Sequence, residues 1–169
     1  MIFLKKLLSF IFNRDFRRNL LRYERAMRYA LWRKDYPRAI KEYQAILKDR
    51  KCEIEETLVY RNLGETYWWN GNIQEAERNL RKSLELKMKK KGHDAYLYKL
   101  LGDICMKTGK FEEALQFYEK AIQFGSKGFV NKHLVNMDEV LRQKVSLEEH
   151  KDKLPFMTAY FEQNKRKFL

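Results

Sequence analysis

Apolar residues recur at helical spacing through the second half of the chain. Tyr98, Leu101 and Cys105 follow the i, i+3, i+7 spacing that places side chains on one face of a helix. A short break around Gly109 follows, and a second apolar face comes after it. The pattern predicts two helices over residues 94–125, the second with its apolar face at Ala114, Leu115, Tyr118, Ala121 and Ile122.

The same pattern occurs a second time, 38 residues upstream. Tyr60, Gly64, Gly71 and Ala76 each precede their counterparts Tyr98, Gly102, Gly109 and Ala114 by this step. A period of this length predicts an array of helical repeats, in which each repeat packs against its neighbour. Small residues at the Gly64 and Ala76 positions would let the two helices of a repeat approach closely.

A third, weaker copy lies further upstream. Met27 stands where the better copies have glycine on the first helix, and Lys34 stands where they have the turn glycine. We therefore expect a degenerate first repeat. The residues that still fit the pattern are Tyr23, Ala26, Ala30, Tyr36, Ala39, Tyr43 and Ile46.

These motifs resemble the tetratricopeptide repeat. That family combines a large residue, Leu-Gly and an aromatic residue on its first helix with Ala, an aromatic residue and Ala on its second. The matching residues are Tyr98, Leu101, Gly102, Ala114, Tyr118 and Ala121, and less fully Tyr60, Leu63, Gly64, Tyr67, Ala76 and Leu80. The resemblance implies an all-α, short helical-hairpin solenoid of about three repeats, which we place at about 15–50, 54–91 and 94–125 within an array over 14–125.

The period exceeds the family's usual period of about 34 residues by roughly one helical turn. The stretch from Lys87 to Gly92 is the predicted location of one extension. We expect Gly92 to cap the lengthened helix and Asp94 to cap the start of the next one.

Residues 128–169 are expected to form C-terminal capping helices. Val130, Leu134, Met137 and Leu141 predict an amphipathic helix that covers the last repeat. The sequence from Ser146 to Glu149 has the form of a capping box and predicts the start of a further helix. The tail after Pro155 would pack on the array or contact a partner.

Charge is concentrated near the N-terminus. Residues 1–50 hold 14 Lys and Arg against 5 Asp and Glu, whereas the whole chain has a net charge of +13. A local basic face favours an acidic partner, which could be anionic lipid, nucleic acid or an acidic protein, and a plainly solvated face is the alternative. The residues of this predicted basic face are Arg14, Arg17, Arg18, Arg22, Arg25 and Arg28.

Residues 1–13 form an apolar segment with a polar stripe at Lys5, Lys6 and Ser9. Twelve helical residues span roughly 18 Å, which is too short for a hydrocarbon core of ~30 Å. No cleavage site of the signal-peptide type follows. The segment would lie in a membrane interface, cap the first repeat or dock into a neighbouring subunit; its apolar residues are Ile2, Phe3, Leu4, Leu7, Leu8, Phe10, Ile11 and Phe12.

The resemblance also implies a concave groove that takes a protein or peptide, lined by the first helix of each repeat. Of the adjacent pair Trp68 and Trp69, we expect Trp68 to face this groove and the other to pack, with Trp32 at the border. The predicted groove residues are Arg28, Leu31, Leu58, Arg61, Glu65, Trp68, Tyr96, Lys99, Asp103 and Met106.

No catalytic, cofactor-binding or metal-binding pattern occurs in the sequence. The three histidines are far apart, and Cys52 and Cys105 form no metal-binding motif. We expect Cys105 to be a buried free thiol, which favours a reducing compartment. The sequence therefore predicts a non-enzymatic cytoplasmic adaptor, with peripheral attachment to the inner face of a membrane as one option. The alternatives are a soluble RNA- or acidic-protein-binding module and a self-associating structural subunit.

Overall fold

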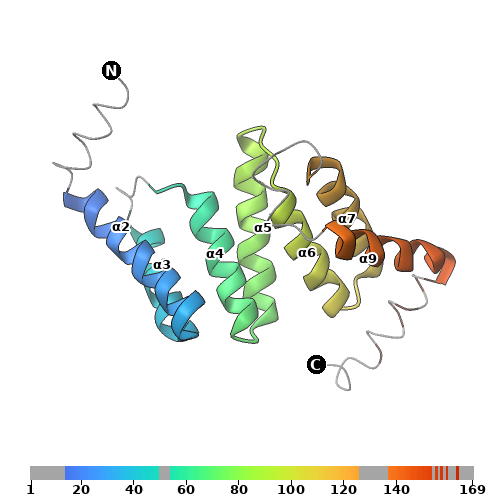
Figure 1. Ribbon diagram of the computed structural model, residues 1–169, viewed down its shortest axis with the longest axis horizontal. Helices are drawn as coiled ribbons and strands as arrows, with labels where there is room; N and C mark the ends of the chain where they lie inside the picture. Colours follow the sequence, from blue (N-terminus) through green and yellow to red (C-terminus); the bar gives the residue numbers. More distant parts are fainter. Residues whose placement is uncertain are drawn as a thin grey trace. The chain divides into compact units, whose positions relative to one another are not determined.

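The computed structural model describes residues 14–49, 54–125 and 137–153, together with the single positions 155, 157, 159 and 163. The chain forms two compact units, Met1–Leu86 and Lys87–Leu169. The described residues are helical and contain no strand (Figure 1). The predicted all-α fold of packed helical hairpins is confirmed.

In the first unit, α2 (Arg14–Met27) continues directly into the π-helix η1 (Arg28–Arg33), and α3 (Tyr36–Lys48) packs against both. The next helix, α4 (Glu56–Trp69), packs against α3 and is followed by α5 (Ile73–Lys89). Apolar side chains at helical spacing meet in one core, with the Tyr23 ring edge-on to Tyr43. The core residues are Ala26, Ala30, Ala39, Tyr43, Ile46, Val59 and Leu63.

In the second unit, α6 (Ala95–Lys107) and α7 (Phe111–Gly125) form a hairpin, and α9 (Met137–Glu149) packs on α7. A short 3-10 helix, η2 (Lys151–Lys153), follows α9. The predicted apolar faces of α6 and α7 are buried against each other. The buried apolar residues of these predicted faces are Tyr98, Leu101, Cys105, Ala114, Leu115, Tyr118 and Ala121. The division into repeats and capping helices stays a prediction.

The two repeated glycines on the first helices mark places where helices lie too close for a side chain. A Cβ atom on Gly102 would stand 2.6 Å from Cε1 of Tyr118. A Cβ atom on Gly64 would stand 2.7 Å from Cγ of Leu80. Both pairs join the two helices of one hairpin, so the repeated pattern sets the spacing between them.

The turn after each first helix requires one residue in the left-handed region. Gly71 has φ +80° and Gly109 has φ +74°. Lys34 adopts the same conformation, with φ +52°, although its Cβ makes this region unfavourable. The weak first repeat therefore keeps the turn geometry without the turn glycine.

The first helix of the weak repeat contains one extra residue in its last turn. In the better copies, a backbone N–H after the turn reaches back five residues, from Asn72 to the Tyr67 oxygen and from Lys110 to the Cys105 oxygen, both at 2.9 Å. In the first hairpin the Asp35 N–H reaches back six residues to the Tyr29 oxygen, also at 2.9 Å. This wide turn is η1, which the sequence pattern did not predict.

Gly92 closes the end of α5, as predicted, because it donates its N–H to the Lys87 oxygen at 3.0 Å. The residue in the left-handed region at this helix end is Lys91, with φ +53°. The predicted cap of the next helix is confirmed, because the Asp94 carboxylate accepts from the Leu97 N–H at 3.1 Å.

The predicted helix start at Ser146 was wrong. Helix α9 runs Met137–Glu149, so the capping-box sequence lies in its last turn. Leu147 is buried there, and its packing outweighs the local preference of Ser146 for a helix start. Residues 126–136, which include part of the predicted capping helix, lie outside the described residues.

The strained turn at Lys34 leads to a paired prediction. Lys34→Gly should raise the free energy of unfolding by up to about 1 kcal/mol, because it removes the left-handed strain. Gly71→Ala should lower it by about 1 kcal/mol, since an added Cβ meets nothing within 4 Å and only the backbone is strained. Urea titrations followed by circular dichroism measure both. A destabilised Lys34→Gly variant would contradict the strain at this turn.

Candidate functional site

The predicted groove residues of the first unit lie on η1 and α4. Arg28 is exposed, and the Leu31 side chain retains 49% of its accessible surface. The four predicted residues on α4 are half-buried: Leu58, Arg61, Glu65 and Trp68. Of the predicted groove residues in this unit, the two on the weak first repeat are therefore the most accessible.

The predicted groove residues of the second unit lie on α6 and are half-buried. Lys99 forms an ion pair with Asp103 one helical turn away. The Tyr118 hydroxyl on α7 donates to the second oxygen of Asp103 at 2.9 Å. Asp103 therefore also joins α6 to α7, and Tyr96 and Met106 complete the predicted set.

The tryptophans differ strongly in exposure. Trp69 lies with its ring centroid 6.2 Å from that of Tyr36, so it packs between α4 and the start of α3 while remaining 39% exposed. Trp68 is half-buried. Trp32, which the sequence placed only at the groove border, is 81% exposed and is the most exposed large apolar side chain among the described residues.

A hollow of about 460 Å³ lies beside the π-helix. We call it the η1 hollow. Its apolar lining comes from Met27, Leu31 and Trp32, and its charged residues are Glu24 and Arg28. The sequence predicted Arg28 and Leu31 as groove residues and Trp32 at the groove border, but it did not predict the wide turn that carries them.

Half of the predicted basic face is engaged in contacts within the first unit. Arg18 pairs with Asp49 at 2.7 Å and with Asp15 at 3.0 Å, and the hydrogen bond to Asp49 raises the pKa of Arg18. Arg25 pairs with Glu42 on α3 at 3.2 Å. These contacts show that part of the arginine surplus is used to attach α2 to α3.

Asp49 is the centre of a polar contact between these helices. Besides Arg18, its carboxylate accepts from the side-chain amide of Asn19 at 2.9 Å. Asn19 is fully buried, and its own oxygen accepts from Arg22 at 3.2 Å. Because a buried amide is costly to leave without partners, Asp49 fixes the beginning of α2 against the end of α3.

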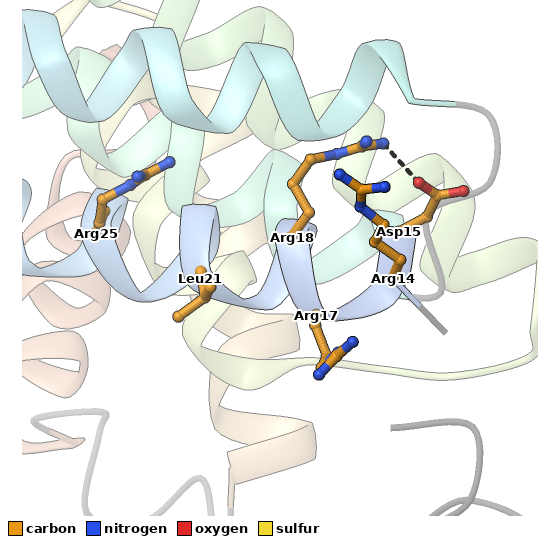
Figure 2. A pocket seen from close by; sticks show the side chains of 6 residues that line it. All are labelled: Arg14, Asp15, Arg17, Arg18, Leu21 and Arg25. Carbon is orange, nitrogen blue, oxygen red and sulfur yellow. Dashed lines mark ion pairs between the residues drawn. The ribbon is translucent and has the colours of Figure 1, made fainter. Parts of the chain in front are cut away.

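The outer side of α2 carries a second hollow, which we call the basic hollow. Its volume is about 520 Å³, and Leu21 within it is 58% exposed. Figure 2 shows Arg18 reaching toward Asp15, while Arg17 and Leu21 extend from the other side of the ribbon. The lining residues are Arg14, Asp15, Arg17, Arg18, Leu21 and Arg25.

The apolar N-terminal segment predicted at residues 1–13 lies outside the described residues. Among the helices that the structure describes, none combines the length and apolarity that crossing a bilayer requires.

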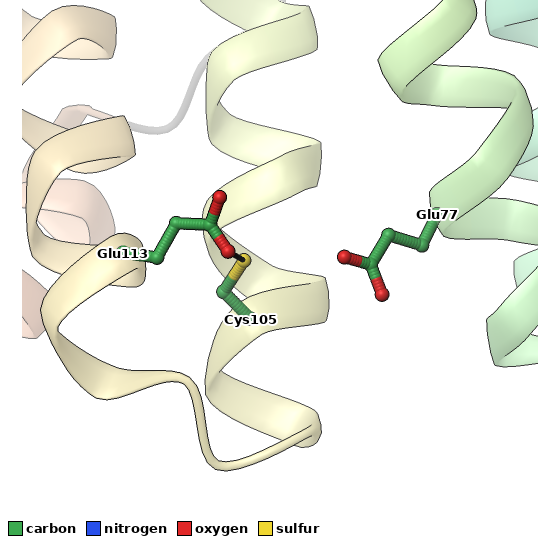
Figure 3. A group of neighbouring side chains, drawn as sticks. All are labelled: Glu77, Cys105 and Glu113. Atoms are coloured by element: carbon green, nitrogen blue, oxygen red, sulfur yellow. Dashed lines mark hydrogen bonds between the residues drawn. The ribbon is translucent and has the colours of Figure 1, made fainter. Parts of the chain in front are cut away.

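Two side chains of the second unit, Cys105 and His93, contact neighbouring residues. Cys105 is a buried free thiol, as predicted, and Figure 3 shows its sulfur directed at Glu113, with Sγ 3.5 Å from the carboxylate. The His93 ring stacks on Phe124 with centroids 3.7 Å apart, and its Nδ1 lies 3.2 Å from the Tyr98 hydroxyl. Cys52 lies outside the described residues.

Comparison with known families identifies the two better repeats. Residues 54–125 match the family model described as Tetratricopeptide repeat. These residues are therefore similar to tetratricopeptide repeats. No curated protein sequence matches the chain. Tetratricopeptide repeats generally mediate binding between proteins and are typically non-enzymatic. The matched tetratricopeptide repeats begin after α3, so the hairpin with the π-helix and both hollows precedes them.

The Asp49 contact leads to a stability prediction. Asp49→Ala should lower the free energy of unfolding by about 1–3 kcal/mol, because it leaves the buried Asn19 amide without its acceptor. Arg17→Ala on the outer side of the same helix should change it by no more than about 0.5 kcal/mol. Urea titration compares the two variants. Equal, small effects would show that the contact does not hold α2 in place.

Proposed function

We propose that this chain is a non-enzymatic adaptor that binds proteins through the first helices of its hairpins and gathers them into a larger assembly. The tetratricopeptide repeats at 54–125 support the general role. The buried free thiol of Cys105 suits a reducing compartment, so we place the adaptor in the cytoplasm.

One observation carries this proposal. Leu31 and Trp32 are 49% and 81% exposed side by side at the end of the first hairpin's first helix, where the family places its partner surface. Large apolar side chains that are grouped and exposed mark interaction surfaces, and tryptophan and arginine are enriched at binding hot spots. The half-buried Trp68 and Arg61 on α4 would extend the contact area.

Affinity capture with the full chain tests the proposal. A partner protein should be retained by the unchanged chain and lost from Trp68→Ala and Arg61→Ala, with at least about a tenfold decrease in affinity for a hot-spot residue. Helical circular dichroism should be unchanged. Lys82→Ala, which removes an exposed ion pair with Glu85 on α5, is the matched control. Undiminished capture by both groove variants would refute the assignment of these residues.

A second role, attachment to an anionic membrane, is favoured by the basic hollow. Arg14 and Arg17 are exposed there and have no ion-pair partner among the described residues, and the exposed Leu21 lies between arginines. Each basic residue near an anionic leaflet contributes on the order of 1 kcal/mol. The apolar sequence of residues 1–13 would add a second attachment signal.

Co-sedimentation with vesicles tests the membrane role. Binding to anionic vesicles should exceed binding to neutral ones, and it should fall when residues 1–13 are removed or when Arg14 and Arg17 are changed to Glu. The charge change should cost at least about tenfold in partition coefficient. The same variants in an RNA gel-shift assay address the nucleic-acid alternative. Equal, negligible sedimentation with both lipids would remove the membrane role.

A further inference from the structure

We propose that the η1 hollow binds a partner segment in which one bulky apolar side chain stands next to acidic side chains. This inference rests on the proposed adaptor function and specifies the chemistry of its partner. It places recognition on the hairpin that precedes the tetratricopeptide repeats.

The apolar half of the site consists of Met27, Leu31 and Trp32. Trp32 is 81% exposed and Leu31 is 49% exposed, so burying them against a partner would remove much apolar surface from water. Met27 lies in the same hollow and is half-buried. Its flexible thioether can adapt to side chains of different shape.

The π-helix explains why these side chains are available. The turn closed by the Asp35 N–H and the Tyr29 oxygen holds one residue more than its counterparts at Gly71 and Gly109. Leu31 and Trp32 both lie inside this wide turn. The turn is followed by the left-handed Lys34, so the local backbone departs from regular geometry at two adjacent places. Such single wide turns often occur at functional sites.

The charged half of the site comes from Arg28 and Arg33. Arg28 lines the η1 hollow and also an adjoining hollow of about 110 Å³, which Arg25, Tyr29 and Arg33 complete. The Arg33 guanidinium lies over the Tyr29 ring, 5.8 Å from its centroid, and that contact orients it.

Two nearby carboxylates are paired with other arginines, so the Arg28 and Arg33 guanidiniums are available to a partner. Arg25 is paired with Glu42, and Arg38, on the same Tyr29 ring, is paired with Asp35. Within the described part of the chain, Arg28 and Arg33 have no acidic partner. A carboxylate suits two neighbouring guanidiniums, because it accepts several charge-assisted hydrogen bonds.

The geometry favours a protein segment over a lipid surface here. Met27, Leu31 and Trp32 line one concave apolar site, and such a site can accept a single bulky side chain. Glu24 is also exposed beside it and would repel anionic headgroups. An extended or helical protein segment can place its acidic side chains on Arg28 and Arg33 and avoid Glu24.

Short acetylated and amidated peptides test this proposal by fluorescence anisotropy with the full chain. One peptide has phenylalanine between glutamates. A second replaces the phenylalanine with alanine, and a third replaces the glutamates with glutamines. The first peptide should bind at least about tenfold more tightly than either of the others.

Variants assign each preference to its half of the site. Trp32→Ala should remove the advantage of phenylalanine over alanine, and Arg28→Gln should remove most of the advantage of glutamate over glutamine. Leu21→Ser and Arg17→Gln, on the outer side of α2, are matched controls that should keep both preferences. Circular dichroism confirms that each variant is folded.

Three results would overturn the inference: equal binding of the peptides, preferences that survive both variants, or a Trp32→Ala variant that loses only vesicle binding. The last result would assign the surface to a membrane. Loss of the peptide preferences with retained capture of a partner by the full chain would leave the adaptor function standing. If the full chain captures no partner protein while the peptide preferences are preserved, the adaptor role would be rejected instead.

Discussion

The close approach of paired helices at Gly64 and Gly102 is the constraint on which the better-formed part of the structure depends. At both positions the space of a Cβ atom is filled by a large side chain of the second helix, Leu80 or Tyr118. A bulky residue opposite a glycine fixes how near the two helices can come and which faces meet. The turn geometry at Gly71 and Gly109 then directs the chain back at the correct angle.

The first hairpin meets the same geometric demands with other means. Small buried residues at Ala26, Ala30 and Ala39 allow contact between its helices, and the polar contact at Asp49 fixes their far ends. The turn is closed with a strained Lys34 after a wide last turn. The first repeat lacks the favourable glycine at its turn and exposes large apolar side chains there. Such departures from the favourable local sequence are expected at binding sites.

The sequence predicted those parts of the fold that depend on periodic packing. The apolar faces of α6 and α7, the glycine turns and the Asp94 cap follow from residue type and spacing alone. The wide turn η1 could not be predicted, because Arg28–Arg33 reads as an ordinary helix until its hydrogen bonds are known. The basic face appeared in the sequence as one charged surface, but its pairing with Asp49 and Glu42 depends on tertiary contacts.

We propose that this chain meets its protein partner at the hairpin before the matched repeats. Site-specific photo-crosslinking in cells tests it most directly, with a benzophenone side chain introduced at position 32 and, for comparison, at the exposed position 85 on α5. We expect a discrete protein adduct from position 32 and none from position 85. Adducts from position 85 with none from position 32 would contradict it.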